Sequence, residues 1–212
     1  MYLPSHFEER DIEKLQSAVE LHPLATWIVA SSQQLAINHI PFLLDKNRGQ
    51  YGTLVGHVAR TNSVWKLLTN NHQCAAVFQG EQSYISPSWY PSKHENHKAV
   101  PTWNYLVVHA HGIARTIDDR DWLLSHVTQL SNQHESTQPK PWHVSQAPAE
   151  YLDKMLGAIV GVEITIEELI GKFKLSQNRS RDDQHGVVAG LHQAGDTDSV
   201  AMAELMKRKL NQ

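Results

Sequence analysis

The spacing of apolar residues along the chain alternates between a helical and a strand-like period. Between Phe7 and Val19 the apolar positions recur at an approximately helical spacing. This pattern predicts a first helix, capped by Ser5, that ends before His22–Pro23. From Leu24 onward β-branched and aromatic residues dominate, which is typical of strands.

Six stretches read as strands, because short apolar or alternating runs are bounded there by polar breaks or turn residues. The predicted strands are 24–32, 35–45, 51–59, 73–80 extended by 84–85, 103–117 and 158–169. The first two are separated by Gln33–Gln34, as in a hairpin, and Asn47 to Gly49 forms the next turn. Gly112, in the middle of a long strand, indicates a bulge or a close backbone approach.

Further helices are expected between and after these strands. The first is a short helix capped by Asn62 and running through Leu68, and the second is capped by Asp118 or Asp119 and runs to about residue 132. A third covers 149–156, and a further helical stretch follows Arg179. The C-terminal helix, from Thr197 or Asp198, is amphipathic, with Val200, Ala203, Met206 and Leu210 on one face.

Many strands joined mostly by hairpins favour an antiparallel barrel over alternating parallel units. The expected fold class is therefore α+β, with an antiparallel barrel core and flanking helices. At 212 residues and 41% hydrophobic, the chain suits one domain. We assign residues 1–191 to that domain, and 192–212 to a C-terminal helix that packs on the domain or on a dimer partner.

The charge balance narrows the classes of function. Nineteen basic residues face 22 acidic ones, giving a formal net charge of −3. A global basic field for nucleic acid is thereby excluded, so any DNA contact is expected to be weak or indirect. The terminal cluster Lys207-Arg208-Lys209 is the best local candidate, although it equally suits its own helix C-terminus.

The number of cysteines and the length of the apolar runs indicate the cellular compartment of the protein. The single cysteine, Cys74, lies in an apolar run, which excludes an intrachain disulfide and predicts a buried thiol in a reducing compartment. No apolar leader and no run of about 18 apolar residues is present. The sequence therefore predicts a cytoplasmic protein with no membrane segment.

Three donor-rich or aromatic stretches stand out. They are Gly56-His57-Val58-Ala59-Arg60-Thr61-Asn62, the pair Ser86-Pro87-Ser88-Trp89-Tyr90 and Pro101-Thr102-Trp103-Asn104-Tyr105, and Gly171-Lys172-Phe173-Lys174-Leu175-Ser176-Gln177-Asn178-Arg179. Cations and hydroxyls suit a phosphate, amides suit a pyrimidine edge, and flat rings suit a fused aromatic system. Together these stretches predict a site for an aromatic, phosphorylated ligand.

Those stretches, with Tyr2-x-Pro4, Ser31-Ser32 and Pro41-Phe42, resemble the PaiB family of FMN-binding negative transcriptional regulators. The resemblance runs from the first residues to about Leu191. It implies a split β-barrel of the flavin-reductase and pyridoxamine-phosphate-oxidase type, and a homodimer with FMN at the subunit interface. It also implies a repressor role in bacterial gene regulation.

The candidate FMN site follows from both lines of reasoning. Its residues are His57, Arg60, Asn62, Ser86, Trp89, Tyr90, Thr102, Trp103, Asn104, Lys172, Lys174, Gln177 and Asn178. Arg60 and the Lys172/Lys174 pair are expected to hold the phosphate, and the lysines alternate on an extended segment and so point the same way. The alternatives are an ordinary core position for Trp103 and Tyr105 and a surface ion pair for Arg60.

Other chemistries are weaker. The 14 histidines suggest a metal, but His94 and His97 fall in a polar loop, and His109 and His111 have no carboxylate or cysteine nearby in sequence. We therefore expect no metal site. Nucleophile-elbow, dinucleotide and Walker motifs are missing. Catalytic residues stay unassigned, and the alternatives to a regulator are a flavin-dependent oxidoreductase and a haem-binding or haem-degrading split barrel.

Overall fold

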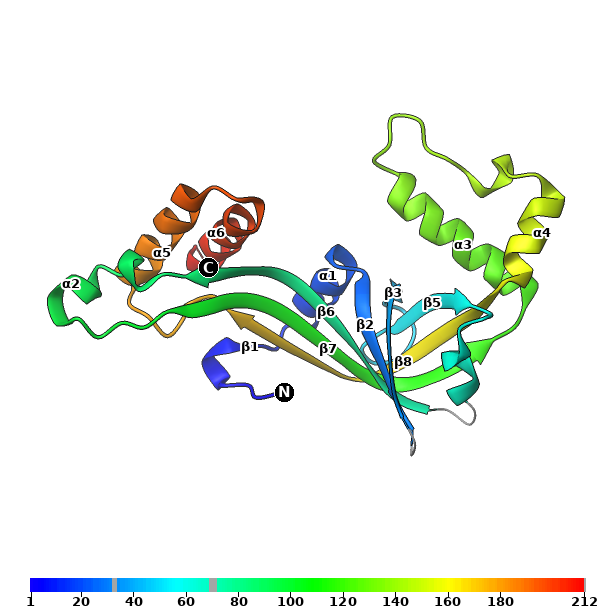
Figure 1. Ribbon diagram of the computed structural model, residues 1–212, viewed down its shortest axis with the longest axis horizontal. Coiled ribbons are helices and arrows are strands. Elements are labelled where there is room, and N and C mark those ends of the chain that lie inside the picture. Colours follow the sequence, from blue (N-terminus) through cyan, green and yellow to red (C-terminus); the bar gives the residue numbers. More distant parts are fainter. Residues whose placement is uncertain (32–33, 69–71, 212) are drawn as a thin grey trace. The chain divides into compact units, whose positions relative to one another are not determined.

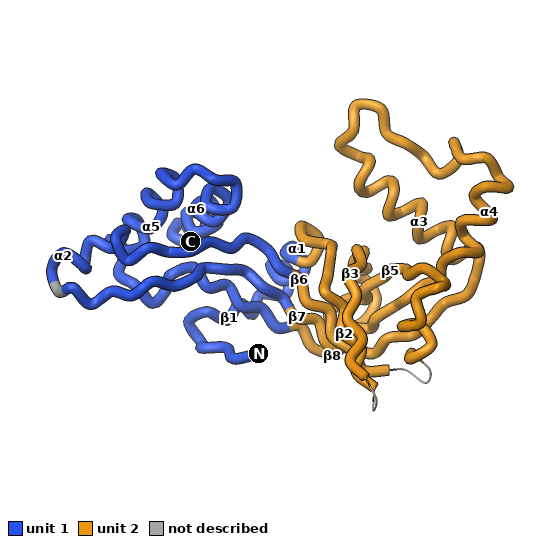
Figure 2. Tube along the Cα trace, in the orientation of Figure 1, with its two compact units in different colours: residues 1–18, 79–108, 170–212 blue, residues 19–78, 109–169 orange. Residues whose placement is uncertain are grey.

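The computed structural model describes residues 1–31, 34–68 and 72–211, and they divide into two compact units (Figure 2). Unit 1 consists of residues 1–18, 79–108 and 170–212. Unit 2 consists of residues 19–78 and 109–169. Each unit is therefore built from segments that lie far apart in the sequence.

The strands of the described chain are β1 (Glu8–Glu9), β2 (Leu24–Ala30), β3 (Leu35–Pro41), β4 (Leu43–Asp45), β5 (Thr53–Ala59), β6 (His72–Ile85), β7 (Thr102–Ile117) and β8 (Ile159–Lys174). The α-helices are α1 (Ile12–Leu21), α2 (Ser92–Asn96), α3 (Arg120–Glu135), α4 (Ala149–Gly157), α5 (Arg181–Ala194) and α6 (Thr197–Leu210). Short 3-10 helices are η1 (Ser5–Phe7), η2 (Ser63–Leu67), η3 (Pro87–Trp89) and η4 (Val144–Gln146).

The strands follow the order β3-β2-β6-β7-β8-β5-β4, and β1 pairs with β8 outside this path. The β2–β3, β2–β6, β4–β5 and β5–β8 pairs are all antiparallel. In unit 2 the two ends of the path, β3 and β4, are separated along the chain by Phe42 alone. The two outer strands therefore meet at that residue, so the sheet curls round, while β3 and β4 remain the two ends of the strand path. The predicted antiparallel α+β split barrel is confirmed.

The unit 2 core lies inside this curled sheet. Trp27 and Phe42 are almost fully buried and meet edge to face, with their ring centroids 6.4 Å apart. Leu54, Val162 and Ile164 are completely buried, as expected for inward-facing strand residues. Cys74 is a buried free thiol, as predicted, and burial raises its pKa to about 11.

Unit 1 contains the ends of β6, β7 and β8, together with α5 and α6 (Figure 1). These elements share one buried cluster, formed by Ile85, Tyr90, Leu175, Val187, Val188, Leu191, Met202, Ala203 and Met206. The C-terminal helix is amphipathic as predicted, but Met202 rather than Val200 completes its buried face. The domain boundary expected at residue 191 stays a prediction.

Two local predictions are confirmed. The Asn62 side chain accepts a hydrogen bond from the Val64 N–H at the start of η2, and the Asp119 side chain caps α3 by accepting from the Trp122 N–H. The predicted hairpin break includes Gln33, which lies outside the described residues, as does Ser32 of the quoted motif.

The N-terminal prediction is wrong. The first long helix, α1, begins at Ile12, where the Asp11 carboxylate accepts from the Glu13 N–H, so Ser5 is not its cap. The reason is a distant partner: Glu8 and Glu9 pair with Lys172 and Gly171 of β8 and are therefore extended.

Candidate functional site

Two lysines of β8 lie on one face of the unit 1 strands. Lys172 and Lys174 alternate with Phe173, which packs against the buried cluster, so the lysines point to the opposite face. The Lys172 ammonium donates to the Tyr2 carbonyl at 3.1 Å and lies 5.3 Å from the centre of the Tyr105 ring. Lys172 is only 7% exposed.

Lys174 is held from the neighbouring strand. Its ammonium group donates to the Thr102 hydroxyl at 2.5 Å and to the Trp103 carbonyl. Burial lowers the pKa of Lys174, and the positive charges of Lys172 and Arg179 lower it further. Three cations therefore lie close enough to repel one another.

Within the described residues, no carboxylate balances this charge. The described residues place no carboxylate in an ion pair with Lys172, Lys174 or Arg179. Glu8 lies opposite Lys172 in the strand register, but its carboxylate pairs with Arg10. Half-buried cations without a carboxylate are a favourable place for an anion from outside.

Aromatic and amide groups adjoin the lysines. Trp103 and Tyr105 alternate on β7 and, with Gln79, Gln82 and neighbouring backbone, line a hollow of about 300 Å³. The Trp103 side chain is 54% exposed, which is unusual for so large an apolar group. We call this surface, formed by Gln79, Gln82, Trp103, Tyr105, Lys172, Lys174 and Arg179, the cationic-aromatic face.

Four other predicted residues in unit 1 make internal contacts. Asn104 is fully buried and donates to Ser176 at 2.9 Å, and the Gln177 side chain accepts from the Leu175 N–H. Ser86 accepts from the Ser88 N–H and caps η3. Tyr90 is buried, with the Arg179 guanidinium 4.8 Å above its ring.

The last two candidates in unit 1, Trp89 and Asn178, differ in how accessible they are. Trp89 packs against α5, where a Cβ added at Gly190 would lie 2.3 Å from its ring. Asn178 is exposed, so its amide is accessible to a ligand.

Arg60 lies in unit 2, and its guanidinium is already occupied. It pairs with both oxygens of Asp118, at 2.9 and 2.5 Å, and donates to the carbonyls of Gly157 and Ile159. The surface ion pair considered for Arg60 is therefore present. Asn62 also lies in unit 2, where it donates to the Asn38 side chain at 2.7 Å in addition to capping η2.

His57, the third unit 2 candidate, is paired with His126 of α3. Their ring nitrogens are 3.0 Å apart, and the His126 ring stacks on Trp122. Burial lowers the pKa of both histidines, that of His126 to about 4. Burial therefore favours the neutral form of both rings, which share one hydrogen bond.

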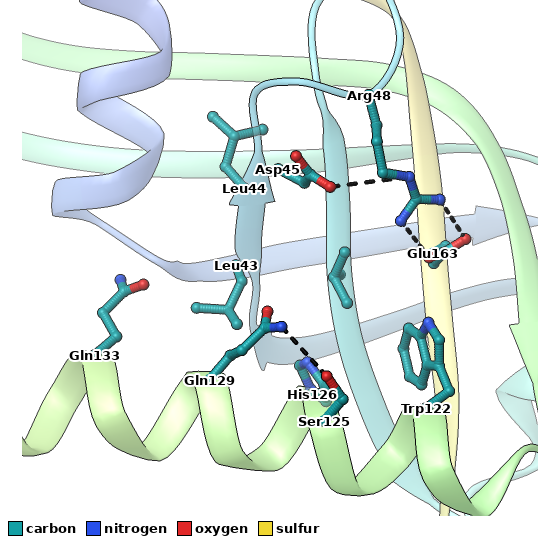
Figure 3. Close-up of a pocket in the computed structure, with 11 residues that line it drawn as sticks. Leu43, Leu44, Asp45, Arg48, Trp122, Ser125, His126, Gln129, Gln133 and Glu163 are labelled. Atoms are coloured by element: carbon teal, nitrogen blue, oxygen red, sulfur yellow. Dashed lines mark hydrogen bonds and ion pairs between the residues drawn. The ribbon is translucent and has the colours of Figure 1, made fainter.

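Figure 3 shows the hollow of about 420 Å³ that adjoins this pair. One face of α3 supplies Trp122, Ser125, His126, Gln129 and Gln133, which point toward β4 and the Arg48 turn. Arg48 forms two hydrogen bonds to the buried Glu163, at 2.6 and 2.9 Å. No side chain of this hollow was a sequence candidate, because the spacing on α3 reads as an ordinary amphipathic helix.

Two further observations concern the described residues as a whole. They contain no group of three or more histidine, cysteine, aspartate or glutamate side chains arranged to hold a metal ion. None of their helices is long and apolar enough to cross a membrane.

Sequence reasoning did not assign Gln79, Gln82, Tyr105 and Arg179 to the site. The signal for Arg179 was present, since it ends the same cationic strip as the two lysines. The two glutamines had no signal, because they lie on β6 and reach the site only through strand pairing.

The fold is that of the split-barrel class of flavin-binding proteins, and comparisons with known proteins give the family. Residues 1–168 match the family model described as "Putative FMN-binding domain". The chain belongs to this FMN-binding family, and FMN is its cofactor. Lys172, Lys174 and Arg179 lie beyond the matched range.

Two relatives extend the comparison. The "Protease synthase and sporulation protein PAI 2" of Bacillus subtilis is 31% identical over 210 residues, which cover 99% of this chain and 98% of the relative. The chain thus belongs to the same family as PAI 2, as the resemblance predicted. An uncharacterized protein of Saccharomyces cerevisiae is 34% identical over 160 residues, covering 66% of this chain and 94% of the relative.

Solved structures show the same fold at low identity. The flavocytochrome Anf3 from Azotobacter vinelandii superposes with a TM-score of 0.58 at 13% identity, covering 84% of this chain and 75% of that one. The FAD and heme binding protein from Mycobacterium smegmatis also gives 0.58, at 14% identity, covering 90% and 80%.

Proposed function

We propose that the cationic-aromatic face holds FMN, with the phosphate at Lys172, Lys174 and Arg179 and the isoalloxazine ring against Trp103. The observation that carries this proposal is the group of three cations without a carboxylate partner in the described residues, beside an exposed indole. The amides of Gln79, Gln82 and Asn178 and the Thr102 hydroxyl supply further hydrogen-bonding groups.

His57, Arg60 and Asn62 contribute less support. Each has internal partners in unit 2, so a role in FMN binding would require it to exchange them. Their assignment to the cofactor site stays a prediction. Asn104 and Gln177 likewise stabilise unit 1 from inside and orient β7 and β8 beneath the lysines.

Titration with FMN, followed by the quenching of flavin fluorescence, tests the phosphate assignment. Lys174→Ala is expected to weaken binding about ten- to a hundredfold, because a charge-assisted hydrogen bond contributes about 1.5–3 kcal/mol. Lys154→Ala is the matched control, since Lys154 is an exposed lysine of α4. Parent-like affinity in both Lys172→Ala and Lys174→Ala would place the phosphate elsewhere.

We further propose that the chain is a negative regulator of transcription, as the family resemblance implies, and that it acts through a partner protein or a flavin-dependent state. Its net charge of −3 supports an indirect route, because direct repression needs a surface that neutralises phosphates. The relative PAI 2 carries protease synthesis and sporulation in its name.

A gel-shift series at physiological salt tests the indirect route. Weak binding with a shallow salt dependence is expected, since few cations are available. Nanomolar, sequence-specific binding that disappears when residues 196–212 are deleted would make α6 a DNA-contacting element and contradict the proposal.

Oxidoreductase activity is the second candidate. The exposure of Trp103 favours it, because a flavin stacked there keeps its other face open to a substrate. Reduction of bound FMN by a nicotinamide cofactor, followed at the flavin absorbance, distinguishes an enzyme from a sensor. A Soret band in the purified protein would instead indicate haem.

We also propose that the chain forms a homodimer through the outer sheet surface of unit 2. Leu35 and Ile37 of the terminal strand β3 and Leu24 of β2 are 59%, 54% and 62% exposed. Exposed apolar strands at a sheet edge are unfavourable in a monomer and typical of an interface.

A further inference from the structure

A second hollow in unit 1, of about 460 Å³, lies where the end of β6 meets the turn between α5 and α6. Its walls include the rings of Tyr84, Trp89 and Trp103, and its rim includes Asp196 and Asp198. The paired Ser83 and Ser199 hydroxyls, 3.1 Å apart, lie among the lining residues. β2 pairs with β6 only over residues 74–77, so this pairing does not extend to the end of β6 at the hollow.

The Tyr84 and Trp103 rings face solvent rather than the core. Tyr84 is 46% exposed and meets the 54% exposed Trp103 edge to face, with the ring centroids 6.2 Å apart. An edge-to-face pair presents the negatively polarised face of one ring beside the other, which attracts a cation more than a neutral apolar group.

The charged groups of the hollow, Asp196 and Asp198, are negative, as are the polarised faces of the rings. No lysine or arginine is among its lining residues, and no ion pair within the described part of the chain involves Asp196 or Asp198. Asp196 caps α6 by accepting from the Ser199 N–H, and the Asp198 side chain is exposed. Lys174 contacts the backbone of Trp103 but does not line the hollow.

We propose that this hollow binds a small organic cation, such as a quaternary or primary alkylammonium. Aromatic walls and unpaired carboxylates are the chemistry that recognises such ions, and the volume fits a small molecule. The ligand would contact Tyr84 and Trp103 through the ring faces and Asp198 through charge. The site shares Trp103 and Gln82 with the proposed flavin face, but its charged groups are carboxylates rather than cations.

Tetramethylammonium and its neutral counterpart of similar size, tert-butanol, are the probes, and shifts of the indole N–H signals in NMR spectra are the readout. Saturable shifts are expected with tetramethylammonium alone. Tyr84→Leu and Asp198→Asn are each expected to weaken binding about two- to fivefold, the range typical of exposed cation–π and ion contacts.

The controls are Tyr151→Leu, an exposed tyrosine of α4, and Asp182→Asn, an exposed aspartate of α5. Both should bind the cation as the parent does. Equal shifts with tert-butanol, no saturation, or unchanged binding in both Tyr84→Leu and Asp198→Asn would overturn the proposal. Because Tyr84 and Asp198 are exposed, neither variant compromises folding.

Discussion

Lys174 combines a structural and a ligand-binding property in one side chain. Its ammonium holds β7 through Thr102 and the Trp103 carbonyl, while burial and then the charges of Lys172 and Arg179 lower its pKa. Below the folded-state pKa the charged form therefore costs folding free energy, and this cost declines as the pH rises from that value toward the ordinary lysine pKa of 10.5. A bound phosphate would offset the repulsion and restore the proton.

FMN affinity is accordingly expected to fall with rising pH, before ordinary lysines titrate near pH 10.5. The phosphate loses its second proton near about pH 6, so its charge is constant above about pH 7. Lys174→Arg keeps its charge and should give a flatter profile between about pH 7 and about pH 9.5. Riboflavin, which lacks the phosphate, is the control ligand, and the same pH dependence for both ligands would exclude Lys174 as the cause.

Residue types and their order over a few positions predicted the helix caps correctly, but they did not predict the partner of Arg60. The caps at Asn62 and Asp119 followed from sequence because a cap bonds to a residue two or three positions away. Arg60 looked like a phosphate ligand for the same local reason, yet its partner, Asp118, is brought in by another strand. A list of donors cannot show which of them are already bonded.

At the scale of elements, the strand period and the turn residues predicted most of the sheet. Of the two alternatives at Gly112, a bulge or a close backbone approach, the structure has the close approach. A Cβ at this position would lie 2.1 Å from the Thr165 carbonyl oxygen of β8. Glu8–Glu9 escaped prediction, because a two-residue strand exists only through its pairing with β8. Likewise β8 extends past the expected end at residue 169 to Lys174, where β1 supplies a partner.

Gly112→Ala is expected to lower the free energy of unfolding by about 1–3 kcal/mol, because the new methyl group meets backbone that cannot rotate away. Gly157→Ala is the matched control, since nothing lies within 4 Å of a Cβ added there. Urea unfolding of the two variants beside the parent measures the difference. Equal midpoints for Gly112→Ala and the parent would show that β7 and β8 can separate at no cost.

At the scale of the whole molecule, the fold class followed from hairpin spacing, whereas the division into two units did not. Each unit gathers segments from different parts of the chain, and β6, β7 and β8 contribute residues to both. Sequence analysis can place a domain boundary only between consecutive segments of the chain. The domain boundary expected at residue 191 falls inside α5.

The proposed homodimer gives a prediction at this scale. Light scattering of the parent should give twice the 24.0 kDa mass of one chain, and Ile37→Lys should shift the particle toward the monomer, because a charge on β3 opposes edge pairing. Leu21→Lys, at a 74% exposed leucine of α1, is the control and should stay dimeric. A parent of 24.0 kDa at micromolar concentration would contradict the interface.

The pairing of β1 with β8 also sets when unit 1 is able to form in a cell. Glu8 and Glu9 leave the ribosome well before their partners Lys172 and Gly171 have been made. Contacts between such distant positions slow folding, because a long loop must close before they contribute. Unit 1 is therefore assembled only once residue 172 has been made, and chains that terminate before residue 171 leave its N-terminal segment without a strand to join.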